Sequence, residues 1–420
     1  MFFLYQILII ILLIFSPLII FFRIFKKKED KKRYKEKFCF PSKKRINGNL
    51  IWFHGSSVGE LLSILPLVQE LEKNKSINQI LVTTSTLSSA QIFKKFSFKK
   101  TIHQFFPIDS ILFSYKFLNY WKPTIAIFVE SEIWPSIFRA LNKKNIPLKL
   151  LNARITKKTF NKWMRVKKFS NSVFQNISIA YPQNEETLNY LKKLNVKKIK
   201  KIGNLKFFNN QQSKLTKLDN TFLKNINLKK IWCASSTHPG EEIICADVHI
   251  NLKKKYKNLL TIIIPRHIHR VNKIVNEIKS LDLNIVLHSS RPKKLNNTDI
   301  YLVDTYGETQ KFYHSSDIVF MGKSISGKGG QNPLEPTNLG STVLYGPNVD
   351  NFKDTYKLLN KLKVAYKVNG VKSLTQSIDK LITKPNNKKN YLKIAKMGKK
   401  ILNETKDEIN SLFNNEIKKT

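Results

Sequence analysis

The chain has 420 residues and a net charge of +45, from 74 Lys and Arg against 29 Asp and Glu. This length exceeds one ordinary domain and predicts two. The charge indicates anionic partners such as nucleic acid, a phospholipid surface or a phosphorylated substrate, although Lys is spread along the whole chain and part of the excess reflects general composition. The three cysteines at 39, 233 and 245 have no pair or metal spacing, which excludes a disulfide scaffold and fits a reducing compartment.

Residues 2–22 form an apolar run that only one glutamine, one serine and one proline interrupt. The run is long enough to span a bilayer as a helix. A cleaved signal peptide is the alternative, but no basic residue precedes the run and no small-residue cleavage site follows it. Seven Lys and Arg residues follow between Arg23 and Arg33, and by the positive-inside rule they predict a cytoplasmic body. We therefore predict a transmembrane anchor at residues 1–25.

From residue 49 onward, short apolar runs alternate with longer amphipathic stretches, which is typical of parallel α/β sheets. The expected strands of the first half are 50–54, 79–84, 124–129, 147–152 and 177–180, with helices at 59–73, 88–96 and 110–120. A polar region then precedes a second series, with strands at 230–235, 259–264, 284–287, 300–303, 317–321 and 342–345 and helices at 240–255, 270–280, 307–315 and 352–361. We predict domains at 26–207 and 223–420, a linker at 208–222, and a deep cleft between strand carboxyl ends. The region from residue 385 is rich in Lys and Asn, and we predict that it forms a surface helix.

The first half opens on Ile51-Trp-Phe-His-Gly-Ser-Ser-Val-Gly-Glu60, where an apolar run ends at a turn of small residues and an amphipathic segment begins. This pattern predicts a strand, a tight loop and a helix start. Glu60 falls at the helix start, where the dipole and free N–H groups favour an ionised carboxylate. A carboxylate at the carboxyl end of such a strand can act as a general base. The alternative is a glutamate that only caps the helix.

The second half repeats this arrangement in Trp232-Cys-Ala-Ser-Ser-Thr-His-Pro-Gly-Glu-Glu242. Its loop N–H groups and hydroxyls can receive a phosphate without a metal, and an ordinary helix cap is the alternative. Pro265 and Arg266 end another strand with a fixed turn and a cation suited to a phosphate or a base edge. His267 and His269 have no third ligand nearby, so we predict no metal site there.

A glycine-rich loop follows in Lys323-Ser-Ile-Ser-Gly-Lys-Gly-Gly-Gln-Asn-Pro-Leu-Glu-Pro336. It lacks the P-loop spacing, because Gly327-Lys328 is followed by Gly329 and not by Ser or Thr. Its glycines allow a ligand to approach the backbone closely. A carboxylate at the following helix entrance can accept both hydroxyls of a ribose, so the loop predicts a nucleotide-sugar site, with an ordinary turn as the alternative.

Further motifs are Glu130-Ser-Glu-Ile-Trp-Pro135, Asn152-Ala-Arg-Ile155, Gly203-Asn-Leu-Lys-Phe207 and Asp304-Thr-Tyr-Gly-Glu308. Four more complete the series: Ser57-Val-Gly-Glu60, Ser236-Thr-His-Pro-Gly-Glu-Glu242, Pro265-Arg-His267 and Gly329-Gly-Gln-Asn-Pro-Leu-Glu-Pro336. Each is modest alone, but the eight in order cover nearly the whole chain. Together with the N-terminal anchor they resemble the 3-deoxy-D-manno-octulosonic acid (Kdo) transferases, which add Kdo to lipid A precursors in Gram-negative bacteria. The resemblance implies the GT-B fold, in which two Rossmann-like α/β domains face each other across a cleft.

The resemblance also assigns roles. Glu60 matches the base that takes the proton of the acceptor hydroxyl, and Glu130 and Lys206 match positions that support the transition state. Without it, Glu130 reads as a strand end and Lys206 as a surface charge. The contacts to the CMP part of the donor match Pro265, Arg266, Tyr306, Gly307, Glu308, Asn332, Pro333, Leu334 and Glu335. No metal or other cofactor is expected.

The chain departs from the family pattern at three places. Lys328-Gly-Gly-Gln331-Asn332 stands where the family often has Arg-Gly-Gly-His-Asn, and Gln331 removes an imidazole there. Pro265-Arg-His-Ile-His-Arg270 replaces Pro-Arg-His-Pro-Glu-Arg, and Tyr306 replaces a methionine. Without that imidazole no acid or proton-transfer role is assigned to position 331, whereas main-chain contacts of the loop would survive.

The implied function is inverting transfer of Kdo from CMP-Kdo to the lipid A precursor lipid IVA, in lipopolysaccharide core biosynthesis. The first domain would bind the acceptor and the second CMP-Kdo, with a single-pass anchor in the inner membrane, a body on its cytoplasmic side and an anionic membrane surface as a further partner. The nearer alternative is another membrane-associated GT-B glycosyltransferase that uses a UDP-sugar and a lipid acceptor. A nucleic-acid binder is the farther alternative, but no helix-turn-helix, zinc module or aromatic RNA motif is present, so no nucleic-acid partner is expected.

Overall fold

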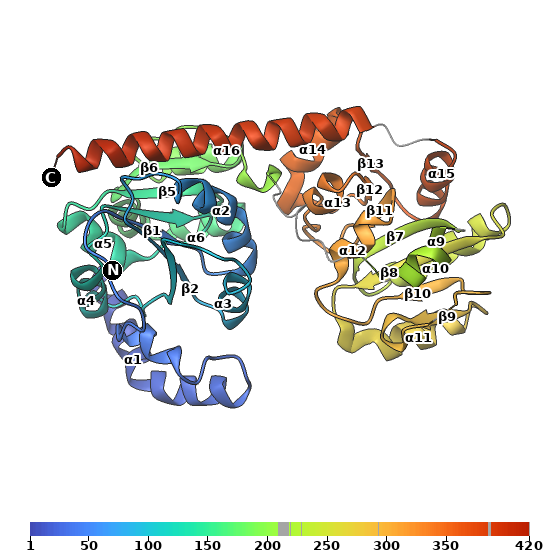
Figure 1. The fold of residues 1–420 in the computed structure, drawn as a ribbon, viewed down its shortest axis with the longest axis horizontal. Coiled ribbons are helices and arrows are strands. Elements are labelled where there is room, and N and C mark those ends of the chain that lie inside the picture. Colours follow the sequence, from blue (N-terminus) through green and yellow to red (C-terminus); the bar gives the residue numbers. More distant parts are fainter. Residues whose placement is uncertain (209–217, 219, 228, 293, 385–387, 420) are drawn as a thin grey trace. The chain divides into compact units, whose positions relative to one another are not determined.

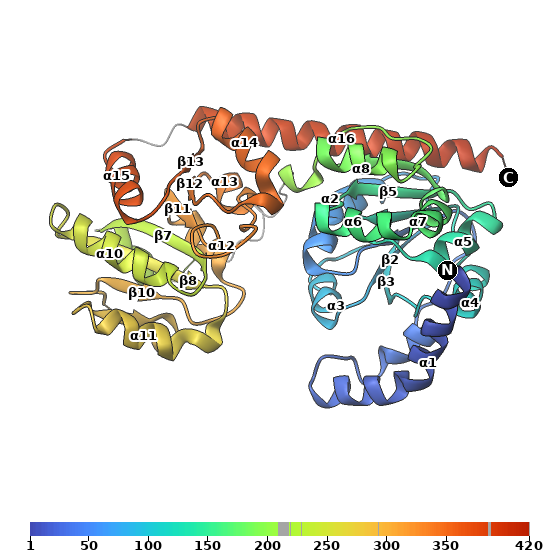
Figure 2. The ribbon, with the colours of Figure 1, turned by 180° about the vertical axis from the view of Figure 1, so that it is seen from behind.

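The structure is a computed structural model that describes residues 1–208, 218, 220–227, 229–292, 294–384 and 388–419. The chain divides into two compact units: unit 1 comprises Met1–Phe208 and Gly398–Thr420, and unit 2 comprises Asn209–Met397. Each unit contains one parallel sheet with helices on both sides (Figures 1 and 2), which confirms the predicted α/β class. Most of the predicted linker lies outside the described residues.

The sheet of unit 1 has six parallel strands in the order β3-β2-β1-β4-β5-β6. They are β1 (Leu50–His54), β2 (Gln79–Thr84), β3 (Thr101–Phe105), β4 (Ile125–Val129), β5 (Leu148–Ala153) and β6 (Ile177–Pro182). Every residue of β1, β2 and β4 is buried, as expected where helices cover both faces of a parallel sheet. This is the doubly wound strand order, whose direction reverses between β1 and β4, and ligands of such sheets bind at the carboxyl ends of those two strands.

Strand β3 was not predicted, because its sequence Thr101-Ile-His-Gln-Phe105 is polar at its centre. The polar side chains of His103 and Gln104 are nevertheless buried. Arg33 donates to the carbonyl of His103 at 2.8 Å, and Thr84 bonds the His103 ring at 2.9 Å. These partners come from distant segments, which a local hydrophobicity pattern does not reveal.

The helices of unit 1 begin at caps that the sequence supplies. The side chains of Ser57, Thr86, Ser110, Thr156 and Asn184 each accept the backbone N–H three residues later. The helices are α1 (Phe2–Phe25), η1 (Arg33–Phe38), α2 (Val58–Leu71), α3 (Leu87–Phe93), α4 (Ile111–Trp121), α5 (Pro135–Lys143), α6 (Lys157–Arg165), α7 (Lys167–Phe174), α8 (Glu185–Lys193) and η2 (Leu205–Phe207). These helices cover a hydrophobic core in which the Trp52 ring packs against Phe106, Phe117 and Phe128.

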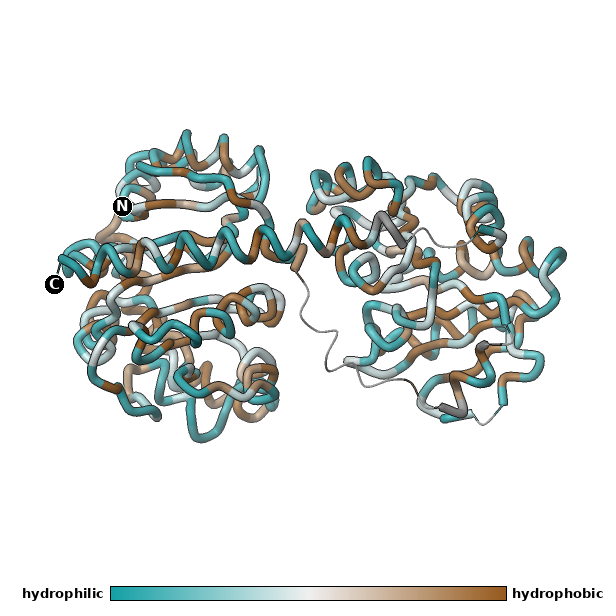
Figure 3. The backbone as a smooth tube through the Cα atoms, turned by 45° about the horizontal axis from the view of Figure 1, so that its top comes forward, coloured by the Kyte–Doolittle hydropathy of each residue, from teal (hydrophilic) through white to brown (hydrophobic). Residues whose placement is uncertain are grey.

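The C-terminal helix α16 (Lys388–Ile417) returns to the first unit, because residues from Gly398 onward belong to unit 1. We predicted that the second domain extends to residue 420, whereas in the structure residues from 398 onward belong to the first unit. Apolar residues recur along α16 (Figure 3), and Ile409 and Phe413 are fully buried. Glu408 accepts a hydrogen bond from Tyr181 at 2.9 Å and pairs with Lys200 at 2.5 Å. The predicted surface helix is therefore present, but in this half of α16 only its outer face is exposed, and its inner face packs on unit 1.

The sheet of unit 2 has seven parallel strands in the order β13-β12-β11-β7-β8-β10-β9. They are β7 (Lys230–Thr237), β8 (Leu259–Pro265), β9 (Ile285–Leu287), β10 (Ile300–Leu302), β11 (Ile318–Met321), β12 (Thr342–Tyr345) and β13 (Ala365–Lys367). The short edge strand β13 was not predicted, since only Ala365 of its three residues is buried. The direction of winding reverses between β7 and β11, so a ligand is expected at their carboxyl ends.

The helices of unit 2 follow the predicted alternation with the strands. They are α9 (Asn220–Asn227), α10 (Glu241–Lys253), η4 (Ile268–Arg270), α11 (Val271–Lys279), η5 (His288–Ser290), α12 (Thr309–His314), α13 (Leu334–Asn338), η6 (Asp350–Phe352), α14 (Lys353–Lys361) and α15 (Val371–Ile382). Trp232, Ile263 and Phe320 contribute to a hydrophobic core over the central strands.

Candidate active site

Glu60 lies where β1 ends and α2 begins, at the reversal point of the unit 1 sheet. Its backbone N–H donates to the Ser57 hydroxyl at 3.3 Å, and its carboxylate accepts the Ser57 backbone N–H at 3.0 Å. This is a complete capping box, so the alternative of a helix-capping glutamate is confirmed as a structural role. Capping does not exclude chemistry, because the carboxylate stays partly exposed at the carboxyl edge of the sheet.

The surroundings of Glu60 raise its pKa to about 7. Burial is the largest cause, and the negative charge of Glu132 is the second. The N–H of Ser57 lowers the pKa, as the helix start predicts, but the two raising effects outweigh it. The shift is therefore opposite to the one predicted from the helix start alone. A carboxylate with a pKa near the working pH is well matched to accepting a proton.

Glu130 and Lys206, which sequence analysis paired only through the family resemblance, form an ion pair of 2.5 Å. Glu130 follows β4, is 4% exposed and adopts a left-handed backbone conformation with φ of 57°. Asn152 at the end of β5 also has a positive φ, and its amide oxygen accepts the N–H of Leu205, which holds the segment that carries Lys206. Left-handed conformations are uncommon outside glycine and cluster at functional sites.

Sequence analysis missed two further side chains at this edge, Glu132 and His54. One oxygen of Glu132 receives hydrogen bonds from Ser56 at 2.5 Å and Trp134 at 2.8 Å, and contacts the His54 ring at 3.0 Å. Burial alone would raise the pKa of Glu132, but these hydrogen bonds outweigh it and lower the pKa. Glu132 lies within the Glu130–Pro135 motif. The sequence signal that could have identified it is the second glutamate, two residues after Glu130, directly after a buried strand.

Glu60, Glu130, Glu132 and Lys206 together form what we call the acidic site. Each of the other three charges acts on the pKa of Glu60, the two glutamates raising it and Lys206 lowering it. The structure thus brings together all three predicted catalytic residues. Their roles stay predictions.

In unit 2, a buried glutamate organises the glycine-rich loop after β11. The carboxylate of Glu241, at the start of α10, accepts backbone N–H groups from the loop at 2.7 to 3.4 Å, donated by Lys323, Ser324, Ile325 and Ser326. It also accepts the N–H of His238 at 2.9 Å. These N–H groups are therefore occupied by the protein itself, so the first part of the loop is a rigid support and not an open phosphate cradle.

Glu242, the next residue, fixes the segment after β8. It binds Arg270 through two hydrogen bonds of 2.9 and 3.2 Å and accepts the Thr237 hydroxyl at 2.9 Å. Pro265 is buried at the end of β8, whereas the side chain of Arg266 is exposed. The predicted cation therefore stands at the carboxyl edge of the sheet, on a turn fixed by the Arg270–Glu242 pair and by the Arg266 N–H, which donates to the Thr237 carbonyl at 3.1 Å.

The turn after β10 presents Tyr306, which is 72% exposed, and Gly307, whose φ of 85° suits glycine. Glu308 contacts the His288 ring at 2.8 Å and accepts hydrogen bonds from Thr305 at 2.6 Å and Lys311 at 2.7 Å. Burial alone would raise the pKa of Glu308, but these partners lower it to about 2. It is an ionised group that shapes the turn.

Asn332, Pro333, Leu334 and Glu335 form the start of α13, also beyond the carboxyl end of β11. The side chain of Asn332 accepts the N–H of Leu334 at 3.2 Å, and the side chain of Glu335 is exposed. Gly329 and Gly330 before them have positive φ, and a side chain at Gly329 would collide with Asn351. All nine predicted donor-binding residues therefore lie at the carboxyl edge of the unit 2 sheet, at a strand end, on a loop or in the first turn of a helix. Their contacts to a donor stay predictions.

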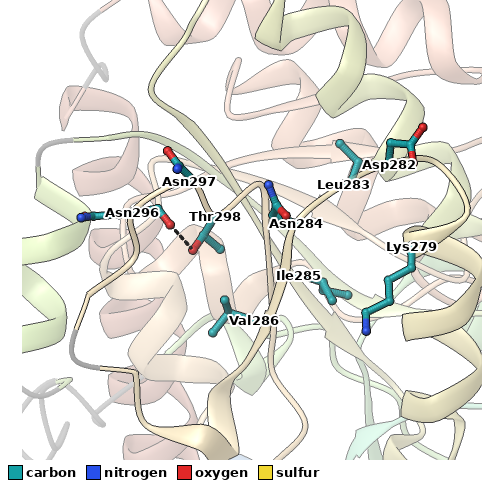
Figure 4. A pocket seen from close by; sticks show the side chains of 9 residues that line it. All are labelled: Lys279, Asp282, Leu283, Asn284, Ile285, Val286, Asn296, Asn297 and Thr298. Atoms are coloured by element: carbon teal, nitrogen blue, oxygen red, sulfur yellow. Dashed lines mark hydrogen bonds between the residues drawn. The ribbon is translucent and has the colours of Figure 1, made fainter.

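The pocket drawn in Figure 4 lies at the opposite edge of the same sheet. Its lining runs from Lys279 at the end of α11 through the start of β9 to Thr298 before β10. None of the predicted site residues lines it, and α/β sheets bind ligands at the other edge, so we assign it no role. Among the described residues, no group of three or more His, Cys, Asp or Glu side chains could hold a metal ion.

Comparison with known proteins agrees with this architecture. Residues 32–209 match the family model described as 3-deoxy-D-manno-octulosonic-acid transferase (kdotransferase). The chain is 34% identical to a 3-deoxy-D-manno-octulosonic acid transferase of Rickettsia bellii, over 92% of this chain and 93% of the relative. It is 29% identical to that of Haemophilus influenzae, over 86% and 85% of the two chains.

Solved structures share the fold at low identity. A glycosyltransferase from Rickettsia africae has a TM-score of 0.56 at 14% identity, covering 89% of this chain and 100% of the other. The UDP-GlcNAc 2-epimerase of Neisseria meningitidis has a TM-score of 0.56 at 16% identity, covering 85% and 99%.

Two parallel-sheet α/β units with these neighbours define the chain as a protein of the GT-B class. Within that class, the match over nearly its full length shows that the chain belongs to the family of 3-deoxy-D-manno-octulosonic acid transferases. It is therefore a glycosyltransferase.

Proposed function

We propose that this enzyme transfers Kdo from CMP-Kdo to a lipid A precursor, lipid IVA, with inversion at the anomeric carbon. The step would belong to lipopolysaccharide core biosynthesis at the cytoplasmic face of the inner membrane. One observation carries the proposal: the partly buried carboxylate of Glu60, with a pKa of about 7, stands at the reversal point of the unit 1 sheet beside a cation and two further carboxylates.

The proposed reaction is a single displacement that needs no enzyme nucleophile. The acceptor hydroxyl oxygen bonds to the anomeric carbon of Kdo, and its proton passes to Glu60. The bond from that carbon to the phosphate oxygen of CMP breaks, and the electron pair leaves on the phosphate. Attack opposite to the leaving group inverts the configuration.

Lys206 and Glu130 act beside this base. The ammonium of Lys206 offsets part of the negative charge that Glu60 shares with its two neighbouring glutamates. The Glu130 carboxylate lies 2.5 Å from the Lys206 ammonium, and the backbone of Glu130 is held in a left-handed conformation. The pair is therefore preorganised, as electrostatic stabilisation of a transition state requires.

The donor would be held by the carboxyl-edge loops of unit 2. Arg266 is an exposed cation on a turn with fixed geometry, suited to the phosphate of CMP. The exposed Tyr306 side chain and the carboxylate of Glu335 are suited to the base and the ribose. Gln331 leaves this part of the site without an imidazole, so the proposal routes no proton through it.

The attachment to a membrane is supported by α1. Within the described residues, Phe2–Phe25 is one helix that is long and apolar enough to cross a bilayer, by length and composition. The basic residues that follow it support a cytoplasmic body.

The test is to incubate the purified protein with CMP-Kdo and a tetra-acylated bisphosphorylated disaccharide. We expect release of CMP and a lipid product heavier by one or more Kdo residues by mass spectrometry, with the inverted anomeric configuration by NMR. A matched reaction with UDP-sugars tests the nearer alternative. Release of UDP with a glycosylated lipid, and no reaction with CMP-Kdo, would overturn the proposed donor.

A further inference from the structure

The first turns of α1 are docked on the body of unit 1. The Tyr5 hydroxyl donates to the carboxylate of Asp109 at 2.6 Å, and the Gln6 amide donates to the Ser136 hydroxyl at 2.8 Å. The Phe2 ring lies 4.5 Å from the guanidinium of Arg139. In Figures 1 and 2 the N-terminus accordingly lies beside α4 and α5. The amino end of α1 is therefore tied to the catalytic body by specific polar contacts.

The carboxyl end of α1 is tied to the same body. Arg23 pairs with Glu29 at 3.0 Å, and the buried Glu29 carboxylate also binds Lys37 at 2.6 Å. Lys37 belongs to η1, and its backbone carbonyl accepts the N–H of Ile108 at 3.0 Å. The two ends of α1 are thus connected to adjacent residues of unit 1. The amino end contacts Asp109 directly, and the carboxyl end is linked to Ile108 through Glu29 and Lys37.

A helix that crosses a bilayer has its ends separated by a hydrocarbon core about 30 Å thick. The contacts of Tyr5 and Gln6 and those of Arg23 instead hold both ends of α1 on unit 1. We infer that α1 is a monotopic anchor, inserted into one leaflet of an anionic phospholipid membrane with both ends on the cytoplasmic side. This replaces the predicted single-pass topology.

The surface of α1 fits a lipid leaflet. Fourteen large apolar side chains on this one helix are exposed: Phe3, Leu4, Ile7, Leu8, Ile10, Ile11, Leu12, Ile14, Phe15, Leu18, Ile19, Phe21, Phe22 and Phe25. An exposed apolar patch of this size needs a partner. The basic residues from Lys26 to Lys32 follow directly at its carboxyl end, so the partner is apolar with a negatively charged rim, as the headgroups and tails of anionic phospholipids are.

The docking point also sets which edge of unit 1 meets the membrane. Ser136, which binds Gln6, lies two residues after Trp134, and Trp134 donates to Glu132 of the acidic site. The anchor is therefore fixed at the carboxyl edge of the sheet, next to the proposed base. This point rests on the proposed function, because it explains how a lipid acceptor reaches Glu60 without leaving the leaflet.

Cross-linking in inverted inner-membrane vesicles tests the topology without measuring transfer. In a Phe2→Cys, Arg139→Cys double variant, a short bismaleimide should join the two cysteines, because their native side chains are in contact. The matched control pairs Ile14→Cys with Arg139→Cys, since Ile14 lies twelve residues farther along the helix, about 18 Å away. The three native cysteines are buried, so wild-type protein gives the background.

A second measurement uses a protease site added before Met1. The cytoplasmic face points outward in inverted vesicles, so external protease should cleave this site in the wild-type background. Absence of the Phe2–Arg139 cross-link, or a protease site protected until detergent is added, would show that the amino end crosses the membrane and would overturn the inference. A protein that passes both tests but does not release CMP contradicts only the proposed function.

Discussion

The carboxylate of Glu60 combines a structural and a chemical task. As one half of a capping box it fixes the start of α2, and as a partly buried acid beside two glutamates it holds its proton up to a pH of about 7. Its folded-state pKa exceeds its ordinary value of 4.5, so its contribution to stability is fully present below pH 4.5 and is lost as the pH rises through 7. The active ionised form is thus the less stable one, as is common where a site is poised for proton transfer.

We predict that the turnover rate falls on the acid side of pH 7, because protonated Glu60 no longer accepts the acceptor proton. Glu60→Gln keeps a capping side chain but should lose about 100-fold or more in kcat at every pH. The measurement is kcat from pH 5 to 9 by CMP release, with CMP-Kdo binding followed by calorimetry. Normal turnover by Glu60→Gln with intact donor binding would rule out the role as base.

We also predict strong coupling between Lys206 and Glu130. Lys206→Met should lower the free energy of unfolding of unit 1 by about 3 kcal/mol, because it leaves the buried Glu130 charge without its cation. Adding Glu130→Gln should recover most of that loss. Urea unfolding followed by tryptophan fluorescence reports mainly on unit 1, since four of the five tryptophans, at 52, 121, 134 and 163, belong to it.

The matched control for this cycle is Lys200→Met, whose pair with Glu408 is more exposed. It should cost at most about 1 kcal/mol. Equal losses for the two lysines would mean that the Lys206–Glu130 pair is no more than a surface contact.

At the scale of elements, α1 and α16 connect the ends of the chain to unit 1 in different ways. Helix α16 packs through apolar residues and approaches the backbone so closely that a side chain at Gly398 would collide with the carbonyl of Phe207. Gly203, four residues before Phe207, also faces α16, and a Cβ there would lie 2.8 Å from the Ile401 side chain. These two glycines therefore set the distance between α16 and the segment that carries Lys206.

We predict that Gly398→Ala destabilises unit 1 by about 1–3 kcal/mol, because the helix must shift away from Phe207. In a solvent-exposed helix the same change would stabilise the protein by about 1 kcal/mol, so the sign alone distinguishes the two cases. Thermal unfolding of the variant beside wild type measures it. Lys400→Ala serves as the control, because Lys400 is an exposed neighbour, and it should leave the midpoint nearly unchanged. A more stable Gly398→Ala would contradict the packing of α16.

At the scale of the whole molecule, the net charge of +45 and the apolar helix α1 both favour an anionic membrane, but by different physics. Attraction by the charge is screened by salt, and the screening length falls to about 3 Å at 1 M ionic strength. The apolar contribution of α1 is not weakened by salt.

We therefore predict that, at low salt, the protein binds vesicles of phosphatidylglycerol and phosphatidylethanolamine more tightly than vesicles of phosphatidylcholine. At 1 M NaCl, an ionic strength of about 1 M, the difference should vanish while binding to both persists. Co-sedimentation over a salt series measures this. Complete release from both vesicles at high salt would mean that charge alone holds the protein and that α1 does not insert.

Most strands could be predicted because a parallel strand is buried on both faces and reads as a short apolar run; 50–54, 79–84 and 342–345 match β1, β2 and β12 at both ends. Strand β3 escaped because its buried polar side chains depend on Arg33 and Thr84. The nine donor-binding positions and Glu60 lie where strands end, in the following loops or at the first turns of helices, as the alternation of strands and helices predicts; their roles stay predictions. Glu132 and His54 were missed because their importance comes from contact with each other.

The sequence by itself determined the α/β class, the apolar N-terminal helix and the turn that carries Glu60, because hydrophobic period, turn residues and caps act within about ten residues. The tertiary structure alone decided the pKa of Glu60, the pairing of Lys206 with a glutamate 76 residues earlier, the return of α16 to unit 1 and the docking of both ends of α1. These properties depend on burial and on charges brought together from distant segments, and such quantities exist only once the chain has folded.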